Sequence, residues 1–222
     1  MASHALITRI DEANETLAAG LQAKGWQPVT APLFNIIQTG PQTIDAQQYR
    51  RIIITSPHAV PAQIITGADF YVVGERAQKA LAKIGATTEV KAFPTIDALL
   101  ANLAQEPATP ILYLRGAHVK KDLKTALDNL DEITLYEARP RETLPEDIKT
   151  MLAKKSIKLV TLHSPRSAAI FMGLVADYTL DEVVFLCMSE DIAKELPRTA
   201  RIIAAVQPNV TGLLNVCPKA NS

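Results

Sequence analysis

The 222-residue sequence is poor in cysteine and has no excess of either charge. Cys187 and Cys217 lack the C-x-x-C spacing of redox and zinc sites and cannot form a disulfide framework, so we expect a reducing, cytoplasmic environment. Basic and acidic side chains number 23 each, which argues against a nucleic-acid-binding protein because such proteins carry a basic surplus. No apolar run approaches the roughly 20 residues that span a bilayer, so no membrane segment is expected.

Motifs of cofactor and metal sites are also missing. No G-x-G-x-x-G or Walker pattern surrounds Gly74, which argues against a bound nucleotide. The four histidines, His4, His58, His118 and His163, do not have the spacing of metal ligands. We therefore expect neither a cofactor nor a metal.

What the sequence does contain is a regular alternation of short β-branched runs with amphipathic stretches. This pattern predicts an α/β fold with parallel sheets built from βαβ units. The stretch from Asp11 to Lys24 predicts a helix that Gly25 ends. Strands are predicted at residues 5–9, 27–33, 51–54, 70–73, 88–91, 110–114, 132–138, 157–162, 182–187 and 201–205.

An internal repeat organises the chain. Four blocks recur in the same order roughly 105–115 residues apart, as expected for a duplicated unit. Each copy contains five predicted strands, which favours two flavodoxin-like doubly wound domains. The blocks begin at Leu6, Thr55, Gly74 and Pro94, and they recur at Leu112, His163, Ser189 and Pro208.

Two Ser-Pro pairs, Ser56-Pro57 and Ser164-Pro165, each follow an apolar strand and open a helix. Serine is a good N-cap, and proline is tolerated at the first helical position. A helix start presents amide hydrogens and the positive end of the helix dipole, so it can bind a carboxylate or a phosphate. Ligand binding and ordinary capping both remain open for each pair.

Further candidates lie at the ends of predicted strands. Arg9 and Arg115 end equivalent strands, where an arginine can grip a carboxylate with two hydrogen bonds. A solvated or ion-paired arginine is the alternative interpretation. His58, Arg166, Lys120 and Lys121 also fall near predicted strand ends, where a solvated surface charge is the alternative interpretation of each. Gly74 at a strand-to-helix turn can serve either a ligand or its own helix.

Taken together, these motifs resemble those of uroporphyrinogen-III synthases. The resemblance implies two flavodoxin-like domains, one of them discontinuous, joined by a two-stranded linker. Carried onto this chain, one domain comprises residues 1–33 and 141–222 and the other residues 36–137, with linker strands near 27–35 and 133–140. The segments that carry the resemblance, in the family's order and over nearly the whole chain, are Leu6–Arg9, Thr55–Val60, Val72–Gly74, Leu112–Gly116, Leu135–Glu137 and His163–Ala168.

The resemblance also implies a reaction. A hydro-lyase of this family takes hydroxymethylbilane, removes its hydroxyl group as water, and closes the ring with the last pyrrole inverted to give uroporphyrinogen III. The substrate's eight carboxylates suit helix starts and backbone amides. Tyr136 matches the family's linker tyrosine and is the candidate to assist the departure of the hydroxyl group. The sequence without the resemblance instead favours a tyrosine whose ring packs in the protein and whose hydroxyl group is exposed to solvent.

The resemblance completes the set of expected site residues and partners. We expect a monomer that binds a small molecule and neither nucleic acid nor membrane. Many family members carry threonine where this chain has Ala77 and Ile192, so a non-catalytic two-lobed module that binds an anionic tetrapyrrole or another anionic ligand is the alternative function. The expected substrate-binding residues are Arg9, Thr55, Ser56, His58, Gly74, Arg115, Gly116, Ser164, Arg166 and Ser167.

Overall fold

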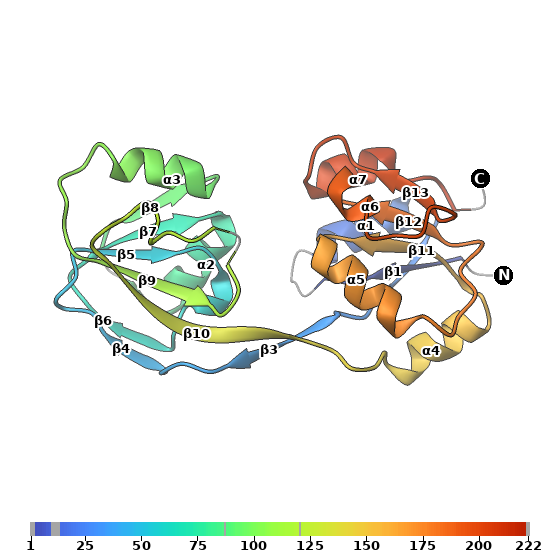
Figure 1. Cartoon of the computed structure of the whole chain (residues 1–222), viewed down its shortest axis with the longest axis horizontal. Helices are drawn as coiled ribbons and strands as arrows, with labels where there is room; N and C mark the ends of the chain where they lie inside the picture. The colour runs from blue at the N-terminus through green and yellow to red at the C-terminus, as the bar shows by residue number, and fades with distance from the viewer. Residues whose placement is uncertain (1–2, 10–13, 87, 120, 221–222) are drawn as a thin grey trace. The chain divides into compact units, whose positions relative to one another are not determined.

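The computed structural model describes residues 3–9, 14–86, 88–119 and 121–220. The chain divides into two compact units, which are described separately below (Figure 1). The first unit comprises Met1–Asn35 and Pro140–Ser222, and the second comprises Ile36–Arg139. Within the described ranges, no helix combines the length and the apolar character needed to cross a bilayer.

The first unit is a five-stranded parallel sheet with helices on both faces. Its strands are β1 (His4–Ile7), β2 (Gln27–Thr30), β11 (Ile157–Leu162), β12 (Val184–Cys187) and β13 (Arg201–Ala204), and their order in the sheet is β13-β12-β11-β1-β2. Its helices are α1 (Asn14–Ala23), α4 (Glu146–Ala153), α5 (Pro165–Leu174), α6 (Glu190–Ala193) and α7 (Val210–Val216).

Burial on both faces explains the continuous apolar runs in these strands. Leu6 and Val160 face the side covered by α4, α5 and α6, where Phe171 of α5 is fully buried. Ile7 and Leu159 face the opposite side, which α1 and α7 cover. Because successive strand residues point to opposite faces, both sets must be apolar.

The second unit is a six-stranded sheet with a small extra sheet. Its main sheet has the order β3-β10-β9-β5-β7-β8, formed by β3 (Phe34–Gln38), β10 (Leu130–Pro140), β9 (Ile111–Gly116), β5 (Arg51–Ile54), β7 (Asp69–Val73) and β8 (Val90–Phe93). All pairings from β10 to β8 are parallel. The other elements are the 3₁₀ helix η1 (Pro57–Ala59), helices α2 (Glu75–Lys83) and α3 (Ile96–Leu103), and the parallel pair β4 (Thr43–Asp45) and β6 (Gln63–Ile65).

Helices α2 and α3 cover opposite faces of this sheet. Ile54 and Val72 pack on the side of Leu81 from α2. Ile53 and Tyr71 pack on the side of α3, which contributes Leu99 and Leu103. The second unit is therefore also doubly wound.

Counting strands within each copy of the repeat reveals the same order in both sheets. The first copy supplies β1, β2, β5, β7 and β8, and the second supplies β9 to β13. We number the five strands of each copy 1 to 5 along the chain. The first unit's sheet, β2-β1-β11-β12-β13, then has the order 2-1-3-4-5. The second unit's main sheet without β3, β10-β9-β5-β7-β8, has the same order. This is the flavodoxin-like order. Each sheet takes its first two strands from one copy and its last three from the other.

The predicted α/β, flavodoxin-like fold with mostly parallel sheets is confirmed, but several element predictions need correction. The strand predicted over 27–33 ends at Thr30, and a separate strand, β3, begins at Phe34, where the sequence pattern alone predicted none and the family resemblance implied a linker strand near 27–35. Strands β4 and β6 were also not predicted, since three residues are too few to show a period. Helix α1 begins its described part at Asn14, and predicted residues 11–13 lie outside the described ranges.

Candidate active site

The candidate site of the second unit lies at the carboxyl ends of β5 and β9. These strands are neighbours at the point where the strand order reverses, which is where open α/β sheets bind ligands. Ser56 follows β5 with extended backbone angles (φ −148°, ψ 138°) and caps η1, its Oγ accepting a hydrogen bond from the His58 amide at 3.3 Å. Serine and Pro57 thus open the short helix as the sequence predicts.

Tyr136 of β10 completes this edge. Its Oη donates a hydrogen bond to Ser56 Oγ at 3.0 Å, and its ring meets the His58 ring edge-on with centroids 5.5 Å apart. Gly116, at the end of β9, leaves room for the phenol ring. A Cβ atom at residue 116 would lie 2.6 Å from Tyr136 Cζ and 2.8 Å from its Oη, so only glycine allows this placement.

A cavity of about 570 Å³ opens at this edge. Thr55 Oγ1 and Tyr113 Oη lie 2.8 Å apart in its wall, and burial raises the pKa of Tyr113. Hydroxyl groups and apolar side chains together surround a space that suits a ring system with polar arms. The lining residues are Thr55, Ser56, Val73, Thr95, Ile96, Tyr113, Gly116, His118, Val119, Lys121 and Tyr136.

The structure brings together four predicted site residues and adds others. Among the predicted residues, Thr55, Ser56, Gly116 and Tyr136 line the cavity. Sequence reasoning noted Lys121 near a strand end without including it in the site, and it missed Thr95, Tyr113 and His118. Each of these residues lies in or after a strand of this edge, whereas Lys120 lies outside the described ranges. A polar residue at the carboxyl end of a predicted strand was therefore the sequence signal that could have identified them.

Arg115 does not line the cavity. Its Nη1 lies 3.2 Å from Glu132 Oε1 in a salt bridge, and its Nε donates to the Gly116 carbonyl at 3.2 Å. The ion-paired alternative therefore describes this arginine. Its visible role is to tie β9 to β10 close to Tyr136.

Gly74 has the positive φ of 82° that favours glycine. Its amide donates to the Phe93 carbonyl at 2.9 Å, so this N–H is already used inside the sheet. A Cβ at this position would meet no atom, and backbone conformation rather than space explains the residue. Its neighbour Val73 reaches the cavity instead.

The carboxyl edge of the first unit contains the second Ser-Pro start. Ser164 caps α5, and its Oγ accepts from the Ser167 amide at 3.0 Å. Ser167 Oγ in turn accepts from the Ser164 amide at 3.0 Å and donates to the Ser164 carbonyl at 2.7 Å. Both hydroxyls are thus engaged in a reciprocal capping box.

Arg9 and Arg166 lie at the same edge of the first unit. Burial lowers the pKa of Arg9. Burial first, and then the charge of Arg9, lower the pKa of His163 to about 3, so this imidazole is neutral. The Arg166 guanidinium lies 4.9 Å from the centroid of the Phe34 ring, a cation–π contact.

The comparisons identify the family. A family model described as uroporphyrinogen-III synthase HemD matches residues 15–215, nearly the whole chain. The chain belongs to the uroporphyrinogen-III synthase family. The family assignment makes it a uroporphyrinogen-III synthase of tetrapyrrole biosynthesis that acts on a small-molecule tetrapyrrole substrate.

Solved structures of Thermus thermophilus uroporphyrinogen III synthase resemble the chain in fold. A selenomethionine derivative of a mutant enzyme matches with a TM-score of 0.50 and 14% identity over 96% of both chains. The wild-type enzyme matches with a TM-score of 0.43 and 14% identity over 96% of both chains. Another Thermus thermophilus structure matches with a TM-score of 0.44 and 12% identity, over 96% of this chain and 98% of that one. A search of curated protein sequences finds no significant match.

Two positions at which many synthases carry threonine are core positions here. Ala77 of α2 is fully buried among the apolar residues beneath the helix. Ile192 of α6 is 1% exposed and packs in the core of the first unit. Neither side chain reaches a surface at which this synthase could bind a ligand.

Proposed function

We propose that this chain is a hydro-lyase that converts hydroxymethylbilane into uroporphyrinogen III, with Tyr136 assisting the loss of water. The observation that carries the proposal is the position of the Tyr136 hydroxyl, which lines the cavity and donates to Ser56 Oγ at 3.0 Å. When substrate enters the cavity, this O–H can turn from Ser56 Oγ to the substrate's leaving hydroxyl group and donate its hydrogen there. General acid catalysis of this kind contributes about 10²–10⁴-fold in rate.

The chemistry asks little more of the protein than a positioned acid. The pyrrole is electron-rich, so its nitrogen lone pair helps to expel the hydroxyl group, which takes the Tyr136 proton and leaves as water. The resulting cation is attacked by the carbon of the last pyrrole ring, and a spiro intermediate rearranges to the inverted ring. The phenolate recovers a proton when the closed ring loses one. Holding the chain in the conformation for this attack supplies the remaining catalysis.

The second unit offers hydroxyl groups for the substrate's carboxylates. Thr55, Ser56 and Gly116 surround the Tyr136 hydroxyl, and His58 packs on its ring. We assign these residues to substrate binding, and Gly74 to shaping the turn beside Val73. Arg115 positions this edge through its salt bridge with Glu132.

At the carboxyl edge of the first unit, taken by itself, Arg9 and Arg166 supply positive charge for carboxylates. Ser164 and Ser167 form the capping box at the start of α5. They contribute to substrate binding by holding this helix start in place. A helix start with adjacent arginines is a suitable anion site.

We also propose that the two units correspond to the two domains of the fold, residues 1–33 with 141–222 and residues 36–137. The contact division between residues 35 and 36 and between 139 and 140 supports this. Linker strands near 27–35 and 133–140 are supported by the pairing of β3 with β10.

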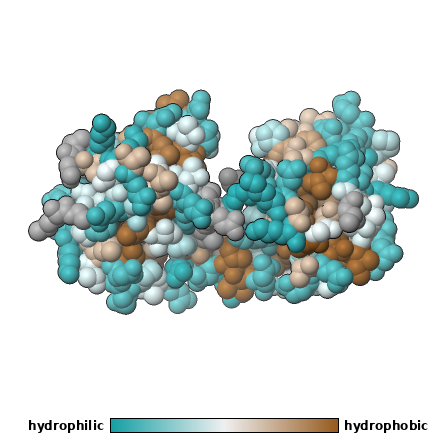
Figure 2. Space-filling model, turned by 180° about the vertical axis from the view of Figure 1, so that it is seen from behind, coloured by the Kyte–Doolittle hydropathy of each residue, from teal (hydrophilic) through white to brown (hydrophobic). Residues whose placement is uncertain are grey.

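We also propose that the protein is a monomer in a reducing, cytoplasmic compartment. Its exposed hydrophobic side chains and its two free cysteines support this. Large hydrophobic side chains that are exposed among the described residues are Ile37 of β3, Ile65 of β6 and Val206 of the loop between β13 and α7, so they lie in separate segments. On the face shown in Figure 2, hydrophilic residues cover most of each unit and hydrophobic patches are small and separated. Both cysteines are free and buried, and burial raises the pKa of Cys187 to about 11, which makes this thiol unreactive.

The decisive experiment is an isomer assay. Purified protein mixed with freshly prepared hydroxymethylbilane is expected to give mostly the type III product. Formation of the spontaneous type I isomer alone would overturn the proposed activity. Tight binding of uroporphyrinogen without turnover would instead support the alternative, a non-catalytic module for anionic tetrapyrroles, which the buried Ala77 and Ile192 favour.

A further inference from the structure

The cavity of the second unit has an uneven distribution of charge. Of the described residues that line it, Lys121 alone has a fully charged side chain, and none is aspartate or glutamate. The rest of the polar lining consists of the hydroxyls of Thr55, Ser56, Thr95, Tyr113 and Tyr136 and the imidazole of His118. This combination of one ammonium and several hydrogen-bond donors suits a carboxylate.

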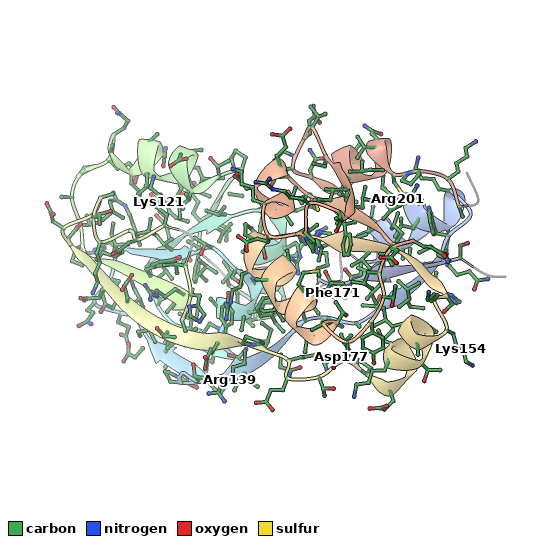
Figure 3. All side chains as sticks on the ribbon, turned by 45° about the vertical axis from the view of Figure 1, so that its right-hand side comes forward. Lys121, Arg139, Lys154, Phe171, Asp177 and Arg201 are labelled. Carbon is green, nitrogen blue, oxygen red and sulfur yellow. The ribbon has the colours of Figure 1, made fainter. Side chains whose placement is uncertain are left out.

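Lys121 comes from the segment that follows β9 and lies beside α3 (Figure 3). Its Nζ lies 2.6 Å from Asp97 Oδ1 in the first turn of α3. The start of this helix, Thr95 and Ile96, lines the same cavity, but Asp97 itself does not. Lys121 therefore lines the cavity, and its ammonium group is paired with an aspartate whose side chain does not.

The Lys121–Asp97 pair is exposed enough to exchange partners. The two side chains are 43% and 77% exposed, and ion pairs this exposed contribute little to stability because water screens them. A substrate carboxylate that also receives hydrogen bonds from the cavity hydroxyls can displace such a partner. Asp97, which carries the same charge as the substrate's arms, then opposes binding.

We propose that Lys121 binds a carboxylate of the tetrapyrrole substrate and that Asp97 holds the ammonium group until the substrate arrives. This inference rests on the proposed function and adds a residue outside the segments that carry the family motifs. Tyr136 acts at the hydroxyl that leaves, whereas Lys121 acts on a side arm that does not react. Lys121 therefore contributes equally to the ground state and the transition state.

The test is a set of variants measured in the type III isomer assay with hydroxymethylbilane. Lys121→Gln is expected to raise KM roughly tenfold, the loss of one charge-assisted hydrogen bond, with kcat within about twofold of the wild type. Lys121→Arg keeps the charge and should restore most of the affinity. Asp97→Asn should lower KM about threefold, because the competing carboxylate is gone.

A matched control and a double variant make the test specific. Lys79→Gln removes one charge and one exposed ion pair, with Glu75, from the same unit but outside the cavity, and should leave KM within about twofold. The variant carrying both Lys121→Gln and Asp97→Asn should resemble Lys121→Gln alone, because Asp97 acts through the ammonium group. Raising the salt concentration should increase KM less in Lys121→Gln than in the wild type.

Two results would overturn the inference. One is a KM for Lys121→Gln no different from that of Lys79→Gln, and the other is a KM for Asp97→Asn at or above the wild-type value. Thermal unfolding of each variant excludes loss of folding as the cause. If wild-type protein forms no type III isomer, the proposed function itself fails, so the two failures are distinguishable.

Discussion

Tyr136 is the residue on which the chemistry depends most directly. We expect Tyr136→Phe to lower kcat by about a hundredfold, since a general acid contributes about 10²–10⁴-fold, while product affinity changes far less. Phenylalanine keeps the ring against Gly116 and His58 and removes only the hydroxyl that donates to Ser56. The measurement is turnover in the isomer assay together with a product-binding titration.

Tyr49→Phe is the matched control for this substitution. Tyr49 Oη donates to Asp131 at 2.8 Å in the same unit, and this tyrosine does not line the cavity. Its loss should leave turnover within about twofold, since it touches no group assigned to the reaction. Equal turnover of wild type and Tyr136→Phe would remove Tyr136 as the acid.

His163 makes the stability of the first unit depend on pH. Its folded pKa of about 3 lies below the ordinary value of 6.5, so the unfolded chain binds the proton more readily. Stability is therefore present above pH 6.5 and declines as the pH falls from there toward 3. By linkage, the unfolding free energy should decrease by about 2 kcal/mol between about pH 7 and pH 5 from this residue.

Chemical denaturation at several pH values measures this dependence. His163→Gln cannot be protonated, so its stability should vary less over the same interval. An identical decline in both proteins would show that other groups cause it. The sequence did place His163 at this strand end, but its neutrality follows from burial and from Arg9, which only the folded chain brings close.

At the scale of elements, the start of α5 depends on its capping box. Ser167→Ala removes an acceptor for the Ser164 amide and a donor to the Ser164 carbonyl, and the side chain is 5% exposed. We expect a loss of about 1–2 kcal/mol in unfolding free energy. Urea denaturation measures it.

Ser189→Ala provides the comparison at another helix start. Ser189 caps α6 without a side-chain hydrogen bond to that helix, so its replacement should cost less than about 0.5 kcal/mol. Equal losses for the two variants would contradict the structural role assigned to the α5 capping box. The sequence showed a cap at both Ser-Pro starts, but only the structure distinguished Ser56, which also meets Tyr136, from Ser164.

At the scale of the whole molecule, each sheet needs both copies of the repeat. A chain cut between Glu106 and Pro107 separates β5, with Thr55 and Ser56, from β9 and β10, with Gly116 and Tyr136. Neither fragment holds a complete cavity. We expect each fragment to be inactive alone and an equimolar mixture, refolded together, to regain formation of the type III isomer.

Gel filtration of the refolded mixture should show a one-to-one complex. Activity in either fragment alone, or an inactive mixture that nevertheless forms the complex, would contradict this prediction. The exchange of strands also explains why the repeat divides the chain near residue 105 although the compact units divide at residues 35 and 139.

Local sequence patterns by themselves determined the α/β alternation, the repeat, the Ser-Pro helix starts and the resemblance to the synthase family, because periodicity and capping depend on neighbours within a few residues. Tertiary structure alone decided the order of strands in each sheet, the salt bridge of Arg115 with Glu132, and the presence of Lys121 and His118 in the cavity. These features depend on contacts between distant segments, whose free energies no local pattern records. Tyr136 depends on both local pattern and tertiary structure. Its motif could be recognised in the sequence, but its contacts with Ser56 and Gly116 exist only in the folded sheet.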